Sequence, residues 1–364
     1  MISTETNKSK LKLPVKYPVI TSYTNHAHIV SILEAYDYTQ DWLMSNYILI
    51  YCRKNLFNHC WGDFYFPMTY NIRSPECCRY LLKQKLHPET ITSMNIKIID
   101  FLCRSIENHN YVHIMLDSFY IKGTFYYNSV HGYHDMLLYG FDKNSEIFYC
   151  ADFLFSPSGS YTFAEISFED LMHSYDNCDP DSPNNYLYGL IYLYKLTDKD
   201  RASYVFDFQN IIHSLRAYYD CKQLENWEFY HSDDASCVVF GLDVYDELEQ
   251  YVRDTIKQQQ AGFGMRIFYV IYDHKRIMVK RLQYLKECYP QLNDLINPLL
   301  HTYKKLESLG HAITMILLKS HIRKSINIVE GIIEYLHEIK HLEGTALKEF
   351  LTQYDEQYSS QEIH

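Results

Sequence analysis

The chain has 364 residues, which is more than a single hydrophobic core usually holds, so two domains are expected. Hydrophobic residues make up 47% and charged residues 22%, values typical of a soluble globular protein. The net charge of −11 argues against a nucleic-acid partner or an anionic membrane surface, and no stretch has the roughly 18 apolar residues of a membrane helix.

The first domain is predicted over residues 18–197, after a flexible arm at residues 1–17. Its periodicity and turn signals predict, in chain order, helices over 25–36 and 41–51, an edge strand over 64–70, a helix starting at Ser74, a helix over 92–108, strands over 111–116, 136–139, 147–151 and 161–163, a helix over 167–175 and a strand over 186–196. Helices followed by an antiparallel sheet indicate an α+β domain.

The second domain is predicted over residues 198–364 and is mostly α-helical. Long periodic segments cover residues 242–259, 266–288, 290–309 and 311–342, with Gly310 separating the last two. Within the second segment, the basic residues that follow Asp273 are interpreted as a solvated face. The alternative is a surface that docks an acidic carrier protein.

The segment 131–153 has the spacing of a β-hairpin that carries acid–base chemistry. Two apolar runs, 136–139 and 147–150, flank turn residues at Asp142-Lys143-Asn144. His134 precedes the first run and Asp152 follows the second, so an antiparallel hairpin brings the two side chains to the same end of the sheet. A carboxylate beside an imidazole fixes the tautomer that a general base requires. A purely structural His–Asp pair is the alternative.

This pattern, with Tyr139-Gly140-Phe141-Asp142 at the turn, resembles the papain-like cysteine peptidase superfamily. It is most similar to the C39-like group and to the amino-terminal domain of butirosin-type acyltransferases, over residues 18–196. The resemblance implies a papain-like fold, with His134 as general base and Asp152 as its orienting partner. In that family a nucleophilic cysteine begins an early helix, whereas here no cysteine precedes Cys52 and His26 lies near the expected position.

The resemblance also implies a function. It predicts an acyl-transfer or thioester-processing protein of secondary metabolism, of the nonribosomal peptide or polyketide type. Such a protein acts on an acyl or peptidyl chain held on a carrier protein by phosphopantetheine, and passes it to a small-molecule amine acceptor. Without the thiol, His134 would deprotonate the amine directly, and His26 would contact the carbonyl or serve as a second acid or base. The alternative is a non-catalytic scaffold that binds a carrier or partner enzyme.

Other nucleophiles and a metal remain alternatives. Cysteines with possible activation are Cys60, Cys77 and Cys78, and the hydroxyl candidates are Ser22 and Thr24. A zinc or iron site would instead combine histidines from two segments with a carboxylate, namely His26, His28, His131 and His134 with Asp135 or Asp152. The leading interpretation needs neither a metal nor a cofactor. The ten cysteines form no Cys-x-x-Cys pair, which favours reduced thiols in the cytoplasm.

Overall fold

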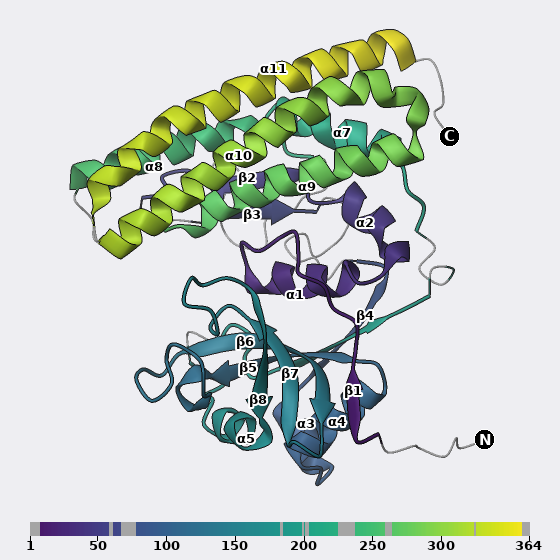
Figure 1. Ribbon diagram of the computed structural model, residues 1–364, viewed down its shortest axis with the longest axis vertical. Coiled ribbons are helices and arrows are strands. Elements are labelled where there is room, and N and C mark those ends of the chain that lie inside the picture. The colour runs from purple at the N-terminus through teal and green to yellow at the C-terminus, as the bar shows by residue number, and fades with distance from the viewer. Residues whose placement is uncertain are drawn as a thin grey trace. The chain divides into compact units, whose positions relative to one another are not determined.

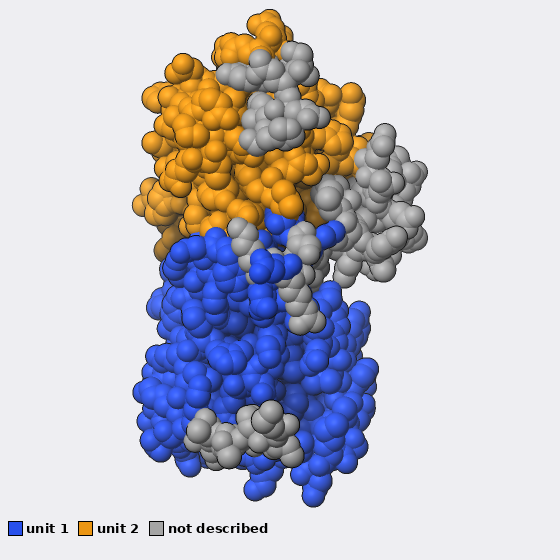
Figure 2. Space-filling view, turned by 90° about the vertical axis from the view of Figure 1, so that its right-hand side faces the viewer, with its two compact units in different colours: residues 1–18, 24–39, 78–204 blue, residues 19–23, 40–77, 205–364 orange. Residues whose placement is uncertain are grey.

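The computed structural model of the chain describes residues 8–57, 61–66, 78–182, 185–198, 200, 204–224, 237–258, 264–323 and 325–358. The chain divides into two compact units (blue and orange in Figure 2), each built from separate segments. Unit 1 consists of Met1–Pro18, Thr24–Thr39 and Cys78–Tyr204, and unit 2 of Val19–Tyr23, Gln40–Cys77 and Val205–His364. Residues 40–77, which the sequence places in the first domain, therefore group with the carboxyl-terminal helices.

Unit 1 is built on a seven-stranded antiparallel sheet. Its strands are β1 (Lys10–Lys12), β4 (Leu81–Leu86), β5 (Tyr111–Asp117), β6 (Tyr133–Asp142), β7 (Ile147–Asp152), β8 (Thr162–Ser167) and β9 (Ile191–Leu196). They are ordered β4-β9-β5-β6-β7-β8, and β1 also pairs with β6. Part of the arm predicted to be flexible, residues 1–17, thus forms strand β1. The helix predicted to start at Ser74 does not extend to residues 81–86, because these form strand β4. Residues 67–77 lie outside the described ranges.

Helices cover both faces of this sheet. In Figure 1, α1 (Thr24–Leu33) lies along one face, and α4 (Ile98–Glu107) and α5 (Phe168–Asp176) lie on the other. The Ser167 side chain caps α5 as predicted, because it accepts a hydrogen bond from the backbone N–H of Asp170. The helix predicted over 92–108 is instead two helices, α3 (Pro88–Ser93) and α4, since Asn95 between them has a positive φ of 55°.

Unit 2 combines a small sheet with long helices. Its strands β2 (Leu49–Arg53), β3 (Gly62–Tyr65) and β10 (Val238–Phe240) are antiparallel in the order β10-β2-β3. Its helices are α2 (Gln40–Ser45), α7 (Phe208–Tyr219), α8 (Val244–Gln258), α9 (Arg266–Cys288), α10 (Asn293–Arg323) and α11 (Ile332–Tyr358). The helix predicted over 41–51 ends at Ser45, because the buried run that follows it pairs between β3 and β10.

Gly310 is a contact point between helices and not a helix end. The sequence predicts a break there, yet α10 continues through it. A Cβ atom on Gly310 would lie 3.3 Å from the Cα atom of Tyr272 in α9. The missing side chain therefore allows α9 and α10 to approach closely.

The predicted combination of helices with an antiparallel sheet, followed by a helical carboxyl-terminal region, is confirmed. The papain-like arrangement stays a prediction. In the described part of the chain, no helix has both the length and the apolar character needed to span a membrane.

Candidate functional site

His134 and Asp152 form the hydrogen-bonded pair that the hairpin spacing predicts. β6 and β7 are antiparallel neighbours, and His134 is near the start of β6 while Asp152 ends β7. The His134 Nδ1 atom lies 2.8 Å from Oδ1 and 3.0 Å from Oδ2 of Asp152. The His134 side chain is 23% exposed, whereas that of Asp152 is fully buried. One side of the imidazole is thus held inside the protein while part of the ring reaches the surface.

The environment of Asp152 favours the tautomer that a base requires. Burial raises the pKa of Asp152, and the charge and hydrogen bond of His134 act in the opposite direction. The Phe153 backbone N–H also donates to Oδ1 at 2.5 Å. The carboxylate therefore accepts the proton on Nδ1 of His134, which leaves Nε2 as the basic nitrogen.

Neither Cys150, which is close to Asp152 along β7, nor the predicted candidate Cys78 has the properties of a nucleophile. Cys150 lies two residues before Asp152 on β7, is fully buried, and has a pKa raised well above its usual value by that burial. Cys78 is also buried. Cys60 and Cys77 lie outside the described residues. Of the hydroxyl candidates, Ser22 belongs to unit 2, where its backbone N–H donates to Asp273 at 2.7 Å.

The α1 histidine that contacts Asp135 of β6 is His28, whereas the sequence predicts a role in the site for His26. His26 and His28 are both fully buried in α1. His28 lies against Asp135, with its Nε2 atom 3.3 Å from the Asp135 carbonyl oxygen. Successive side chains of a strand leave on opposite faces, so Asp135 and His134 point away from each other. The contact of α1 is therefore with the face that carries Asp135.

That face holds a buried cluster of two imidazoles and one carboxylate. His113 of β5 lies with its Nε2 atom 2.6 Å from Oδ2 of Asp135, and His28 Nε2 is 3.8 Å from the same oxygen. One ligand atom from each of the three residues lies within 4.8 Å of the other two. Imidazole nitrogen and carboxylate oxygen are donors that zinc and iron accept. Within the described ranges this is the one group of three or more histidine, cysteine, aspartate or glutamate side chains that lie close enough to share a metal ion.

The predicted set of metal ligands is thus divided among three sites. Only His28 and Asp135 of that set meet in the cluster, while His134 pairs with Asp152. His131 pairs with Asp117 at the end of β5, with Nδ1 and Oδ2 2.6 Å apart. The interpretation of His131 and His134 as ligands in one centre with His28 is not supported by these contacts.

Sequence reasoning missed His113 and Asp117. Apart from Tyr111, His113 is the one ionisable residue in the apolar run 111–116, and such a residue in a strand buried on both faces needs a partner. Asp117 follows the same run and is fully buried. Both signals were present in the sequence, but the partners are distant along the chain.

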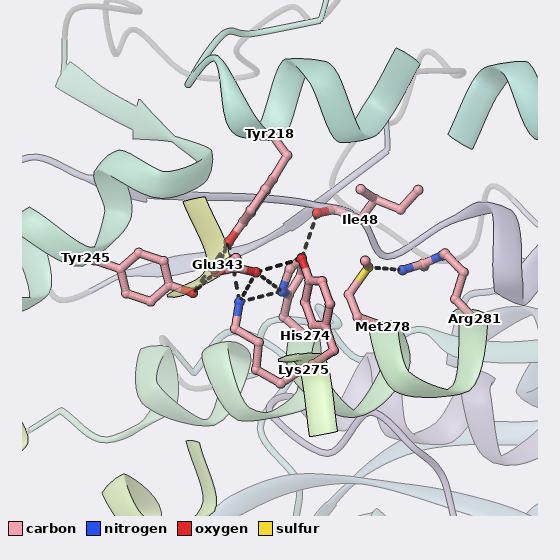
Figure 3. A network of polar contacts seen from close by, with 9 residues as sticks. Ile48, Tyr218, Tyr245, His274, Lys275, Met278, Arg281 and Glu343 are labelled. Atoms are coloured by element: carbon pink, nitrogen blue, oxygen red, sulfur yellow. Dashed lines mark hydrogen bonds and ion pairs between the residues drawn. The ribbon is translucent and has the colours of Figure 1, made fainter. Parts of the chain in front are cut away.

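Most of the basic segment of α9 is buried and does not form the predicted solvated face, although Arg276 and Lys280 are partly exposed. Asp273, His274, Lys275 and Arg281 all have 0% exposure, so these side chains offer no docking surface to a carrier protein. Figure 3 shows that Lys275 and Glu343 lie at the centre of a polar network in unit 2, with their Nζ and Oε1 atoms 2.5 Å apart. His274 donates from Nε2 to the Ile48 carbonyl and accepts from Lys275 through Nδ1.

Unit 2 also has a surface hollow of about 540 Å³ that contains none of the predicted site residues. Two of its basic side chains already have acidic partners, because Lys340 bonds to Asp246 and His337 to Glu249. This pairing reduces the positive charge available to a ligand.

No protein-family model matches the chain, and no curated protein sequence matches it either.

Proposed function

We propose that unit 1 is an acyl-transfer domain in which His134 is the general base and Asp152 orients it. The observation that carries the proposal is the 2.8 Å contact between a buried carboxylate and a partly exposed imidazole. The resemblance of residues 131–153 to butirosin-type acyltransferases supplies the substrate class. That class is an acyl or peptidyl thioester on a carrier protein, with a small-molecule amine as acceptor.

The reaction needs no acyl-enzyme in this proposal. The acceptor nitrogen attacks the thioester carbonyl while Nε2 of His134 removes the proton from that nitrogen. The carbon–sulfur bond then breaks, and the protonated imidazole returns the proton to the leaving phosphopantetheine thiolate. Asp152 stabilises the imidazolium that forms between the two steps. The products are an amide and a free carrier thiol.

Intact-mass analysis of the full chain with acylated carrier domains and candidate amines tests this. The expected result is loss of the acyl group from the carrier, gain of amide product, and no adduct on the protein. His134→Ala should remove the transfer. His173→Ala is the matched control, since His173 is an exposed histidine of α5 in the same unit. Equal transfer by wild type and His134→Ala would contradict the proposal.

The second candidate is a non-catalytic scaffold that binds a carrier protein. It is favoured by the burial of Cys150, the thiol two residues before Asp152 on β7, because a buried thiol is not available to act with the dyad. In the same experiment a scaffold would form a complex with the carrier without changing its mass. Native mass spectrometry of the mixture separates binding from turnover.

A further inference from the structure

The cluster of His28, His113 and Asp135 has a feature beyond three adjacent donors. The outer nitrogen of each imidazole is held by a tyrosine hydroxyl. His28 Nδ1 lies 2.9 Å from the Tyr161 hydroxyl, and His113 Nδ1 lies 3.2 Å from that of Tyr194. Histidines that bind metals almost always have such a partner on the second nitrogen, because it fixes the ring orientation.

The inner nitrogens of both rings lie beside Asp135. That of His113 is hydrogen-bonded to the carboxylate, and that of His28 lies 3.3 Å from the backbone carbonyl oxygen. His113 Nε2 lies 2.6 Å and His28 Nε2 3.8 Å from Oδ2 of Asp135. Ligands at about 2.1 Å from a tetrahedral zinc ion lie about 3.4 Å from each other. The two observed separations lie on either side of this value, one shorter and one longer. The three residues come from α1, β5 and β6, which all belong to unit 1.

We propose that His28, His113 and Asp135 bind one divalent transition-metal ion of the zinc class. Each imidazole would coordinate through Nε2 and donate its Nδ1 proton to the tyrosine oxygen. The fourth position is left for water or another ligand. This inference goes beyond the acyl-transfer proposal and does not depend on it, because the cluster and the His134–Asp152 pair are separate sets of side chains.

The electrostatics of the cluster are compatible with metal binding. Burial, and then the neighbouring His113, lower the pKa of His28 to about 3, so the ring is neutral near pH 7 and has a lone pair to share. Burial alone would raise the pKa of Asp135, but its interactions with the neighbouring histidines, above all the hydrogen bond with His113, outweigh this effect and lower the pKa. Asp135 is therefore an anionic ligand at neutral pH.

The test uses the full-length chain without a histidine tag, stripped of metal by a chelator and titrated with Zn²⁺ and Co²⁺. We expect one Zn²⁺ per chain by elemental mass spectrometry after dialysis, and a visible absorption band of low-coordinate Co²⁺. His113→Asn should abolish both. Tyr161→Phe removes only the hydroxyl beside His28 and should weaken Zn²⁺ binding roughly 10- to 100-fold. His131→Asn is the matched control, since its imidazole is largely exposed and pairs with Asp117 outside the cluster.

Two results would overturn the proposal. One is the absence of Zn²⁺ binding by wild type at micromolar concentration. The other is a stoichiometry that His113→Asn leaves unchanged together with an affinity that Tyr161→Phe leaves unchanged, which would indicate adventitious binding elsewhere among the 18 histidines and 10 cysteines. If His113→Asn does not fold, the proposal is still tested by the Co²⁺ spectrum of the wild type and by the Zn²⁺ affinity of Tyr161→Phe. Metal content is measured without any acyl-transfer assay, so failure of one proposal leaves the other standing.

Discussion

Replacement of Glu343 by Ala tests the energetics of the buried network in unit 2. Oε1 of Glu343 accepts from Lys275 at 2.5 Å and from the Tyr303 hydroxyl at 2.9 Å, and Oε2 accepts from the hydroxyls of Tyr245 at 2.7 Å and Tyr218 at 3.1 Å. Lys275 and Glu343 are both fully buried. The substitution leaves Lys275 without its counter-ion, although burial already lowers the pKa of this amine to about 8, and it removes the carboxylate that three hydroxyls share as an acceptor.

The expected cost is large compared with the total stability of a domain. Breaking a buried ion pair from one side costs about 3–5 kcal/mol, against a total of about 5–15 kcal/mol. Lys275→Met should cost less, because a buried carboxylate without its cation can take up a proton and still bond to the tyrosines. The double variant Glu343→Ala/Lys275→Met should be more stable, by roughly 0.5–3 kcal/mol, than the sum of the two single-variant costs predicts. Glu338→Ala is the control on the same helix, since its pair with Lys305 is exposed and should contribute less than about 1 kcal/mol.

Tryptophan fluorescence during urea denaturation measures these changes in unit 2 alone. The chain has three tryptophans, Trp42, Trp61 and Trp227, and all belong to segments of unit 2. The reasoning is refuted if Glu343→Ala costs less than about 1 kcal/mol, a value expected of an exposed pair. A cost for Lys275→Met above that for Glu343→Ala would also contradict it.

Three further predictions concern the dyad, the thiols and the helix contact. His134→Ala should lower the free energy of unfolding by about 0.5–3 kcal/mol and the rate of acyl transfer roughly 10²–10⁴-fold. Thermal melting measures the first effect and the carrier assay the second. Strong destabilisation with activity retained would show that His134 and Asp152 are a structural pair. Alkylation with iodoacetamide should leave transfer intact, and inactivation by a single adduct mapped to one cysteine would restore a thiol mechanism. Gly310→Val should destabilise unit 2 by about 1–3 kcal/mol because its side chain meets Tyr272, whereas Gly331→Ala, with nothing within 4 Å of its Cβ, should not.

The hairpin was predictable because its information is local. His134 and Asp152 are 18 residues apart, the turn between them has a recognisable composition, and the period of a strand fixes which side chains share a face. The same holds for α9, whose bounds Arg266–Cys288 follow from periodicity alone. Both inferences need no knowledge of distant partners.

Errors arose where a distant partner decides the outcome. Residues 49–53 have an apolar run that fits a helix or a strand, and pairing with β3 on one side and with β10, nearly 190 residues later, on the other makes it a central strand. Lys275 and Arg281 have the composition of a solvated face, and only the position of Glu343 in α11 explains why a lysine is buried there. The composition of a segment shows neither its pairing partner in a sheet nor the position of a distant counter-ion.

The adjacency of His134 and Asp135 shows why the metal ligands could not be chosen from the sequence. Two neighbouring ionisable residues at a strand start look like members of one site, but alternation directs them to opposite faces. Asp135 therefore lies beside His28 and His113, and His134 lies beside Asp152. A one-residue shift of β6 would exchange these partners completely. The register of β6 with β5, which pairs Asp135 with Met115 and Leu137 with His113, therefore determines both candidate sites.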